Sequence, residues 1–311
     1  MLVNKPAKIT SHDVVVQVRR LFRTKKVGHA GALDPFATGL LILCLDEATR
    51  IGDYLVARDK EYVAVLKLGE TTDTQDGTGR VLETRAVPVF SQNDLAAIFA
   101  RFVGEISQIP PMFSARKVQG RRLYKLARAG QTVARAAQRV RIETLEILAV
   151  TLPFIRFRVV CSKGTYIRTL AHDIGEMLGC GAYLHTLERI RIGQFFLKDA
   201  LSLEQLAQQA DRTRFLIPLD EALAFLPAIE VSESAAGLLA HGTRIVLTAE
   251  DFKVLGDDHE RQAENREIRV YRVTGKCIAL ARQTFTGTPT SPQWMVQPLK
   301  VLVKPEINEN T

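Results

Sequence analysis

The chain has 311 residues, of which 46% are hydrophobic and 24% charged, a composition that excludes a predominantly disordered protein and suggests about two domains. Lysine and arginine number 42 against 34 acidic residues, giving a net charge of +8. This charge favours a polyanionic partner such as a nucleic acid over a merely basic soluble protein, but it does not distinguish RNA from DNA.

Cysteine spacing and hydropathy limit the class of protein further. The four cysteines (Cys44, Cys161, Cys180 and Cys277) are widely spaced, which argues against a structural zinc site and favours reduced thiols. No apolar run reaches the roughly 20 residues of a membrane helix, and the first residues are too polar for a signal peptide. We therefore expect a cytoplasmic protein that does not enter a membrane.

The first predicted element is a helix that runs to about Arg23. Thr10 or Ser11 can cap it, and Thr10 with Asp13 resembles a capping box. Its polar face is basic, and this face is either simply solvated or a phosphate-contacting edge. The basic residues of this region are Arg19, Arg20, Arg23, Lys25 and Lys26.

A glycine-rich loop over residues 28–39 follows, with an Asp34-Pro35 step in it. Residues 40–45 form an apolar run typical of a buried strand or helix, and a second helix is predicted over residues 48–56. Alternation over residues 61–68 predicts a strand with Tyr62 on its buried face.

The middle of the chain alternates between turns and short elements. We expect a polar turn over residues 71–79, an amphipathic helix over 94–103 and a short basic helix over 121–128. A strand over residues 154–161 then leads through a glycine turn into a helix with an apolar stripe from Ile167 to Leu178.

The C-terminal region reads as a small, mostly β domain. Pro218 and Pro227 bracket a boundary, and we place it between domains 1–226 and 227–311. Short strand-like runs follow at residues 244–247, 268–273 and 277–281, whereas the charged residues 257–267 are expected to form a flexible loop.

Asp34 is the first residue that could carry chemistry. Asp-Pro is a common turn dipeptide, so a purely structural role is the simpler interpretation. The alternative is that a rigid turn presents one carboxylate into a cleft, where it could attack or stabilise an anomeric carbon.

Other candidates depend on tertiary contacts. Arg168 opens a helix, where the helix dipole disfavours a cation, so a buried carboxylate should hold it. His29 is either structural or able to stack on a base, and no second histidine lies at metal-ligand spacing. Tyr62 and Tyr166 are either core aromatics or stacking platforms for a nucleobase.

Five segments, in order along the chain, resemble the motifs of the TruB family of bacterial tRNA pseudouridine synthases. One such motif would be weak evidence, whereas five in the same order are not expected by coincidence. They are Lys5-Pro6 with residues 10–15; residues 26–41; Tyr62 with residues 68–69 and 72–74; residues 110–115 with 120–124; and residues 162–170 with Leu187.

The resemblance implies an α+β fold: a pseudouridine synthase core with a mixed, largely antiparallel sheet, followed by a small C-terminal PUA-like β-barrel that touches RNA. It implies an isomerase that converts the uridine at position 55, in the tRNA T-loop, to pseudouridine. The C1′–N1 bond breaks, the base rotates and C5 rejoins the sugar. No metal or organic cofactor and no obligate protein partner is implied, and we expect a monomer that binds the T-arm of tRNA.

The resemblance also assigns roles to residues of this chain. Asp34 attacks or stabilises the sugar, Arg168 pairs with Asp34, and Tyr62 stacks on the flipped base and assists a proton transfer. The remaining residues line the uridine pocket or hold the disturbed T-loop: His29, Tyr166 and Leu187. Arg168 would keep the Asp34 carboxylate ionised, and the basic helix with the Arg121-Arg122 edge would contact phosphates.

The chain departs from the family pattern at two positions. Lys8 stands where glycine is usual, and Glu188 where many members carry arginine. Two other functions are possible interpretations of the sequence: a non-catalytic tRNA-binding or folding protein, and a phosphate-binding transferase that uses the glycine-rich loop. The second is disfavoured because the loop lacks a P-loop pattern and Asp34 would repel phosphate.

Overall fold

The computed structural model describes residues 1–118, 120–256, 265–288 and 290–303. The chain divides into two compact units, Met1–Phe215 and Leu216–Thr311. Residues 216–226, which the predicted boundary assigns to the first domain, are held by the second unit, since Arg269 donates hydrogen bonds to the carbonyls of Asp220 and Leu226. The assignment of separate catalytic and RNA-binding domains stays a prediction.

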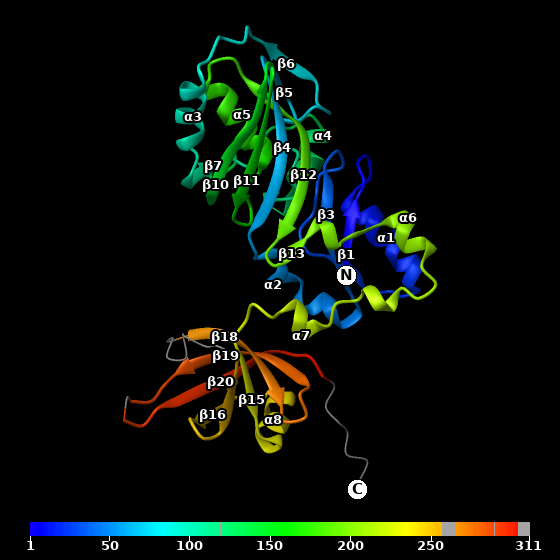
Figure 1. The fold of residues 1–311 in the computed structure, drawn as a ribbon, viewed down its shortest axis with the longest axis vertical. Coiled ribbons are helices and arrows are strands. Elements are labelled where there is room, and N and C mark those ends of the chain that lie inside the picture. The colour runs from blue at the N-terminus through cyan, green and yellow to red at the C-terminus, as the bar shows by residue number, and fades with distance from the viewer. Residues whose placement is uncertain (119, 257–264, 289, 304–311) are drawn as a thin grey trace. The chain divides into compact units, whose positions relative to one another are not determined.

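The first unit is built on a mixed, largely antiparallel sheet (Figure 1). Its neighbours pair antiparallel except for β1 with β14 and β3 with β12. The strand order is β14 (Leu201–Ser202), β1 (Leu2–Lys5), β3 (Thr38–Leu45), β12 (Ala182–Ile192), β4 (Lys60–Leu68), β11 (Phe154–Cys161), β10 (Gln138–Thr151) and β7 (Gly104–Gln108), with β2 (Val27–His29) on β3 and β13 (Phe195–Phe196) on β12.

Helices and two small hairpins surround this sheet. Helices α3 and α5 cover one face and enclose the main hydrophobic core with β4, β11 and β12 (Figure 1). The helical elements are α1 (Ser11–Phe22), η1 (Asp46–Ile51), α2 (Gly52–Val56), α3 (Gln92–Ala100), α4 (Leu123–Arg128), α5 (Ile167–Met177), η2 (Leu197–Asp199), α6 (Leu203–Gln208) and η3 (Thr213–Phe215). The hairpins are β5 (Glu70–Thr72) with β6 (Val81–Thr84), and β8 (Lys117–Val118) with β9 (Arg121–Arg122).

Helix α1 confirms the sequence-based prediction and its cap. The Thr10 hydroxyl accepts a hydrogen bond from the Asp13 amide, while the Asp13 carboxylate accepts one from the Thr10 amide. Val14, Val15 and Val18 are buried against β1 and β3, so the apolar stripe fixes the helix on the sheet.

Several predicted boundaries were wrong. The helix expected over residues 121–128 begins at Leu123, because Arg121 and Arg122 pair with β8 as a strand. The turn expected over residues 71–79 begins two residues later, because Thr71 and Thr72 belong to β5. The helix expected over residues 48–56 is a 3₁₀ helix that continues into α2.

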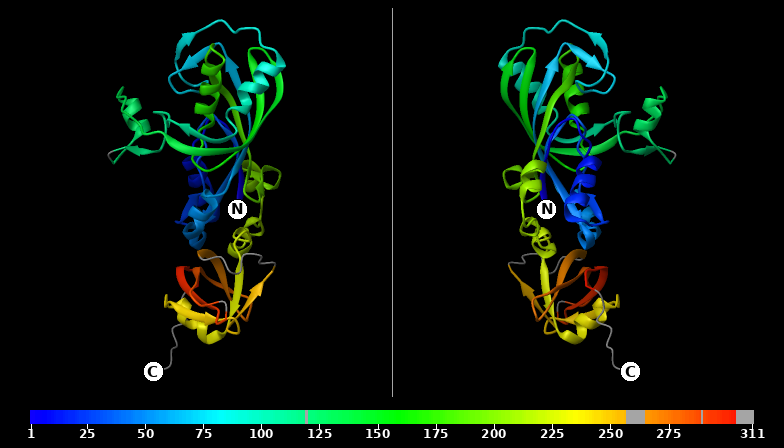
Figure 2. Two further views of the ribbon diagram at one scale, coloured as in Figure 1. Left: turned by 90° about the vertical axis from the view of Figure 1, so that its left-hand side faces the viewer. Right: turned by 90° about the vertical axis from the view of Figure 1, so that its right-hand side faces the viewer.

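A prominent feature of the first unit is an arm formed by β8, β9 and α4, which stands out from the sheet (Figure 2). We call this segment, residues 116–128, the basic arm. Its cationic side chains are exposed: Arg116, Lys117, Arg121, Arg122, Lys125 and Arg128.

The second unit is a curled, six-stranded sheet, which confirms the predicted fold class (Figure 1). Its order is β16 (Ile245–Thr248), β20 (Gln293–Val301), β19 (Cys277–Phe285), β18 (Asn265–Arg272), β15 (Ala228–Val231) and β17 (Phe252–Leu255). Helix α8 (Glu233–Ala240) packs into its core, and α7 (Leu219–Ala222) precedes β15. Of the loop expected over residues 257–267, residues 257–264 lie outside the described part, and the rest starts β18.

Two further observations concern the whole chain. All four cysteines are free thiols, and Cys44, Cys161 and Cys180 are buried. Over the residues that the structure describes, no helix combines the length and apolar character needed to span a bilayer.

Candidate active site

The loop that carries Asp34 joins β2 to β3 and rests on the N-terminal segment of the chain. The Ser11 hydroxyl accepts a hydrogen bond from the Leu33 amide at 2.9 Å, and the Lys8 amide donates to the Pro35 carbonyl at 2.8 Å. Lys8 has a φ of +70°, a backbone conformation that favours glycine. The departure at Lys8 therefore places a side chain at a strained turn while keeping the contact with the loop.

Lys5 supports the same loop from within the protein. Its side chain is fully buried, and Nζ donates hydrogen bonds to the carbonyls of Pro6 and Ile9 at 2.8 Å and of Pro35 at 3.3 Å. Burial lowers the pKa of Lys5 to about 8, and the nearby charge of Asp34 opposes this effect. The N-terminal segment thus fixes the backbone on both sides of Asp34.

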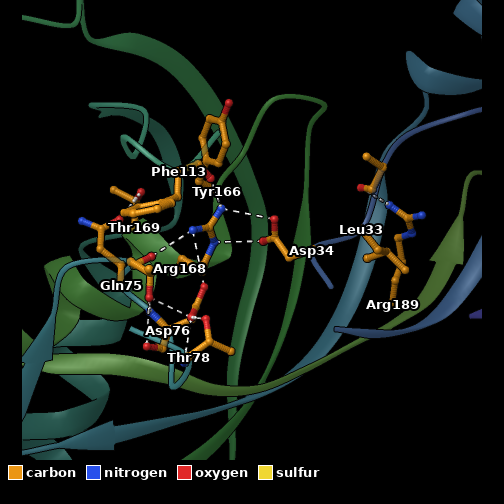
Figure 3. Close-up of polar contacts among 12 residues, drawn as sticks. Leu33, Asp34, Gln75, Asp76, Thr78, Phe113, Tyr166, Arg168, Thr169 and Arg189 are labelled. Atoms are coloured by element: carbon orange, nitrogen blue, oxygen red, sulfur yellow. Dashed lines mark hydrogen bonds and ion pairs between the residues drawn. The ribbon is translucent and has the colours of Figure 1, made fainter. Parts of the chain in front are cut away.

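Arg168 lies in the first turn of α5 and forms a two-point ion pair with Asp34 (Figure 3). Its Nε lies 2.9 Å from Oδ2 and its Nη2 lies 3.2 Å from Oδ1 of the carboxylate. The same guanidinium donates to the carbonyls of Thr74 and Phe113, both at 2.9 Å. A carboxylate does hold the arginine at this helix start, as the dipole argument predicted.

A second carboxylate, Asp76, lies on the other side of Arg168 at 3.5 Å from Nη1. It accepts hydrogen bonds from the Thr74 hydroxyl at 2.8 Å and the Thr78 amide at 2.9 Å, so its position is fixed (Figure 3). Asp76 was not predicted from the sequence, because Asp76-Gly77 is typical of a turn. The threonines on either side of it, Thr74 and Thr78, could have indicated from the sequence that hydrogen bonds hold this carboxylate in place.

A cavity of about 220 Å³ opens beside Asp34. Five of the six site residues expected from the sequence line it: Asp34, Tyr62, Tyr166, Arg168 and Leu187. The other lining residues are Ala32, Leu33, Ser114, Ala115, Thr165 and Ile167. The sixth, His29, is an exposed residue of β2 and does not line this cavity.

The aromatic residues of the cavity are held by the sheet and by a buried amide. Tyr62 is 7% exposed, and burial raises its pKa to about 12. The side-chain amide of the fully buried Gln108 forms two hydrogen bonds with the main chain of Tyr166. Its Oε1 accepts from the Tyr166 amide at 3.0 Å, and its Nε2 donates to the Tyr166 carbonyl at 3.2 Å. Both rings therefore border a preformed space.

Arg168 favours the ionised form of Asp34, as expected, but a second and larger effect opposes it. Its side chain is 37% exposed where it borders the cavity, and the rest of the group is enclosed by protein. This enclosure raises the pKa of Asp34, and the Arg168 charge only partly offsets it. The carboxylate is thus more basic than an ordinary aspartate and remains paired with a cation.

A further residue that sequence reasoning missed is Arg189 of β12. Its side chain is 1% exposed and donates hydrogen bonds to carbonyls of the loop that carries Asp34 (Figure 3). Arginines recur at positions 189 and 191 of this strand, and no feature of the local pattern separates the buried one from its neighbour. Among the described residues, no three or more His, Cys, Asp or Glu side chains are arranged to hold a metal ion.

Comparison with known proteins places the chain in a family. A model described as "TruB family pseudouridylate synthase (N terminal domain)" matches residues 19–167, and one described as "tRNA pseudouridylate synthase B C-terminal domain" matches residues 168–224. The tRNA pseudouridine synthase B of Burkholderia lata is 44% identical, over 91% of this chain and 86% of that protein. That of Cupriavidus metallidurans is also 44% identical, over 91% and 89%.

Solved structures agree on the fold. Cbf5 in a crystal structure of a Cbf5-Nop10-Gar1 complex aligns with a TM-score of 0.74 at 24% identity, over 97% of this chain and 85% of that chain. The archaeal box H/ACA Nop10-Cbf5 complex gives a TM-score of 0.70 at 25% identity, over 98% and 86%. With the matches to curated relatives over most of its length, the chain belongs to the TruB family of pseudouridylate synthases.

Proposed function

We propose that this protein isomerises a uridine of tRNA to pseudouridine and that Asp34 is its catalytic carboxylate. The observation that carries this proposal is the Asp34–Arg168 ion pair at the edge of a cavity bordered by Tyr62, Tyr166 and Leu187. The curated relatives are named tRNA pseudouridine synthase B. The family resemblance of the sequence motifs implies the uridine at position 55, in the T-loop.

The reaction rearranges bonds within one nucleotide. The C1′–N1 bond breaks and a C1′–C5 bond forms, while C5 loses a proton and N1 gains one. A carboxylate beside C1′ can attack or stabilise the electron-poor sugar as the base departs. Arg168 stabilises the charge on Asp34, and a tyrosine such as Tyr62 can stack on the freed base and assist the proton transfer from C5.

The cavity suits a nucleotide that has left the stacked RNA. A base within a folded T-loop is inaccessible until it is flipped out, at a cost of a few kcal/mol. Stacking on an aromatic side chain returns about 1–3 kcal/mol, and the cavity offers Tyr62 and Tyr166. Leu187 contributes an apolar wall, so the flipped uridine would exchange water for protein on several sides.

The basic arm gives this site a means of holding RNA. Six exposed cations project from it, and the arm starts at the cavity itself, since Phe113 accepts a hydrogen bond from Arg168 and Ser114 lines the cavity. We infer that the arm binds phosphates of the tRNA T-arm.

The test is Asp34→Asn with an unmodified tRNA transcript. The variant should lose pseudouridine formation by at least about 10⁴-fold, because the carboxylate takes part in bond cleavage, while binding tRNA nearly as well as the wild type. Chemical mapping of pseudouridine at each uridine measures the first, and filter binding the second. Full turnover by the variant would refute the role of Asp34; a wild type that binds but forms no pseudouridine would favour a tRNA-binding or folding function.

A further inference from the structure

Arg189 is among the largest fully buried side chains of the protein and lies in the middle of the first unit's sheet. A guanidinium removed from water is costly unless its donors are satisfied. Three hydrogen bonds to main-chain carbonyls satisfy this one. Arg189 is therefore a buried cation whose hydrogen-bond partners are main-chain carbonyls. The positions of these carbonyls in the chain indicate what Arg189 does.

The three carbonyls lie on both sides of Asp34: two belong to the loop that carries it, and the third belongs to β3, which follows the loop. Nη2 donates to Gly31 at 2.9 Å and Nη1 to Ala32 at 3.4 Å, before the aspartate. Nε donates to Leu40 at 2.7 Å, after it. One planar side chain thus closes the base of a loop that has little regular structure of its own.

The main chain of Arg189 connects the same loop to the strand that carries Tyr62. It pairs with Gly39 of β3 on one side and with Tyr62 of β4 on the other. Gly39 has a φ of +102°, and a Cβ there would lie 2.4 Å from the Arg189 carbonyl oxygen, so only glycine allows this approach. The charge of Arg189 also lowers the pKa of Tyr62, against the larger effect of burial.

We propose that Arg189 is a positioning residue that fixes the Asp34 loop relative to Tyr62, so that the carboxylate and the aromatic ring meet the flipped uridine in one geometry. The catalytic part of this inference rests on the proposed function. A misplacement of about 1 Å can cost about 100-fold in rate, so a clamp on the loop base can control catalysis without touching substrate.

Arg189→Lys tests the proposal, with Arg191→Lys as the matched control. Lysine keeps the charge, but its donors all leave from one nitrogen, whereas Arg189 reaches its three carbonyls from Nε, Nη1 and Nη2 of a planar fork. Arg191 lies two residues along the same strand and bonds Glu61 and the Gly193 carbonyl instead of the loop. Three quantities are measured on each full-length variant: the single-turnover rate with saturating tRNA, the tRNA affinity, and hydrogen exchange of amides in residues 31–40.

We expect Arg189→Lys to lower the single-turnover rate by about 100-fold, to change tRNA affinity little and to speed exchange in residues 31–40, whereas Arg191→Lys does none of these. A rate equal to that of the control, a slow rate with unchanged loop exchange, or faster exchange with an unchanged rate would each overturn the positioning role.

The exchange measurement needs no turnover, so it separates failure of this inference from failure of the proposed function. Should Arg189→Lys not fold, the wild type still gives an answer. Amides of Leu33 and Ala37, which are bonded to the Ser11 hydroxyl and the Asp34 carbonyl, should then exchange as slowly as those of β3. Fast exchange at these two amides would show that the loop is not clamped.

Discussion

Two opposing effects act on the pKa of Asp34. Enclosure in the cavity raises it, and the two-point contact with Arg168 lowers it, with enclosure the larger effect. In the proposed mechanism, the carboxylate must be ionised to attack or stabilise the sugar. Its raised pKa therefore sets a lower pH limit on the reaction that lies above the usual range of an aspartate.

This limit gives a prediction for Arg168→Gln, which keeps hydrogen-bond donors but removes the positive charge. Without that charge the pKa of Asp34 rises further, so the pH at which the single-turnover rate falls on acidification should move upward. The pH profile of the residual rate checks this. A profile that falls at the same pH in both proteins would contradict the assigned electrostatics.

Lys60 gives a prediction for stability. Its buried ammonium donates to the carbonyls of Val56 at 2.6 Å and Arg58 at 2.5 Å, and burial beside Arg189 lowers its pKa from 10.5 to about 8. Between these two pH values only the unfolded chain holds the proton, so raising the pH stabilises the fold. From pH 8 to 10.5, the free energy of unfolding of wild type should rise relative to Lys60→Met by on the order of 2 kcal/mol. Urea unfolding at both pH values measures this difference.

At the residue scale, the ion pair between Asp34 and Arg168 was easier to predict from the sequence than the residues around it. The dipole argument called for a carboxylate at Arg168, and Asp34 lies there at 2.9 Å. Asp76 and Arg189 were missed because their roles exist only after folding. In the sequence, Asp76 resembles any aspartate in a turn, and Arg189 is one of several arginines in a strand. Only the folded sheet brings Asp76 to Arg168 and Arg189 to the loop that carries Asp34.

Among the secondary-structure elements, those with local signals were predictable. Helix α1 has a capping box and α5 an apolar stripe, and β4 and β11 alternate cleanly. Strand β12 was missed. Register shifts at Leu184/Thr186 and Arg189/Arg191 interrupt its alternation, so the period-2 pattern holds only between them, where Leu187 and Arg189 are both buried.

The basic arm carries a prediction about salt. If Arg121 contacts a phosphate, binding of the wild type releases a counterion from that phosphate. Arg121→Ala removes this contact, so it should reduce the slope of log affinity against log salt by roughly 1. Arg101→Ala, which removes an exposed arginine at the end of α3, should leave the slope unchanged. Titration of labelled tRNA at several salt concentrations measures both. Equal slopes in the two variants would place the RNA elsewhere.

At the scale of the whole molecule, the fold class and the small C-terminal β unit were predicted correctly, whereas the assembly of the site depends on long-range topology. Asp34 follows β2, Tyr62 lies in β4 and Leu187 in β12, and the crossing order β3-β12-β4 makes them neighbours. Periodicity cannot predict a strand order. The expected grouping of these residues came from the ordered motifs of the family resemblance.

The cysteine thiols of the folded chain should react slowly with electrophiles. Burial raises the pKa of all four, to about 12 for Cys161 and about 11 for Cys277, so little thiolate forms near neutral pH. Alkylating reagents should modify the native protein slowly and the denatured chain at once. The rate of cysteine labelling, followed by mass spectrometry, would thus measure the rate at which the folded chain opens. Cys44 and Cys161 report on the first unit and Cys277 on the second.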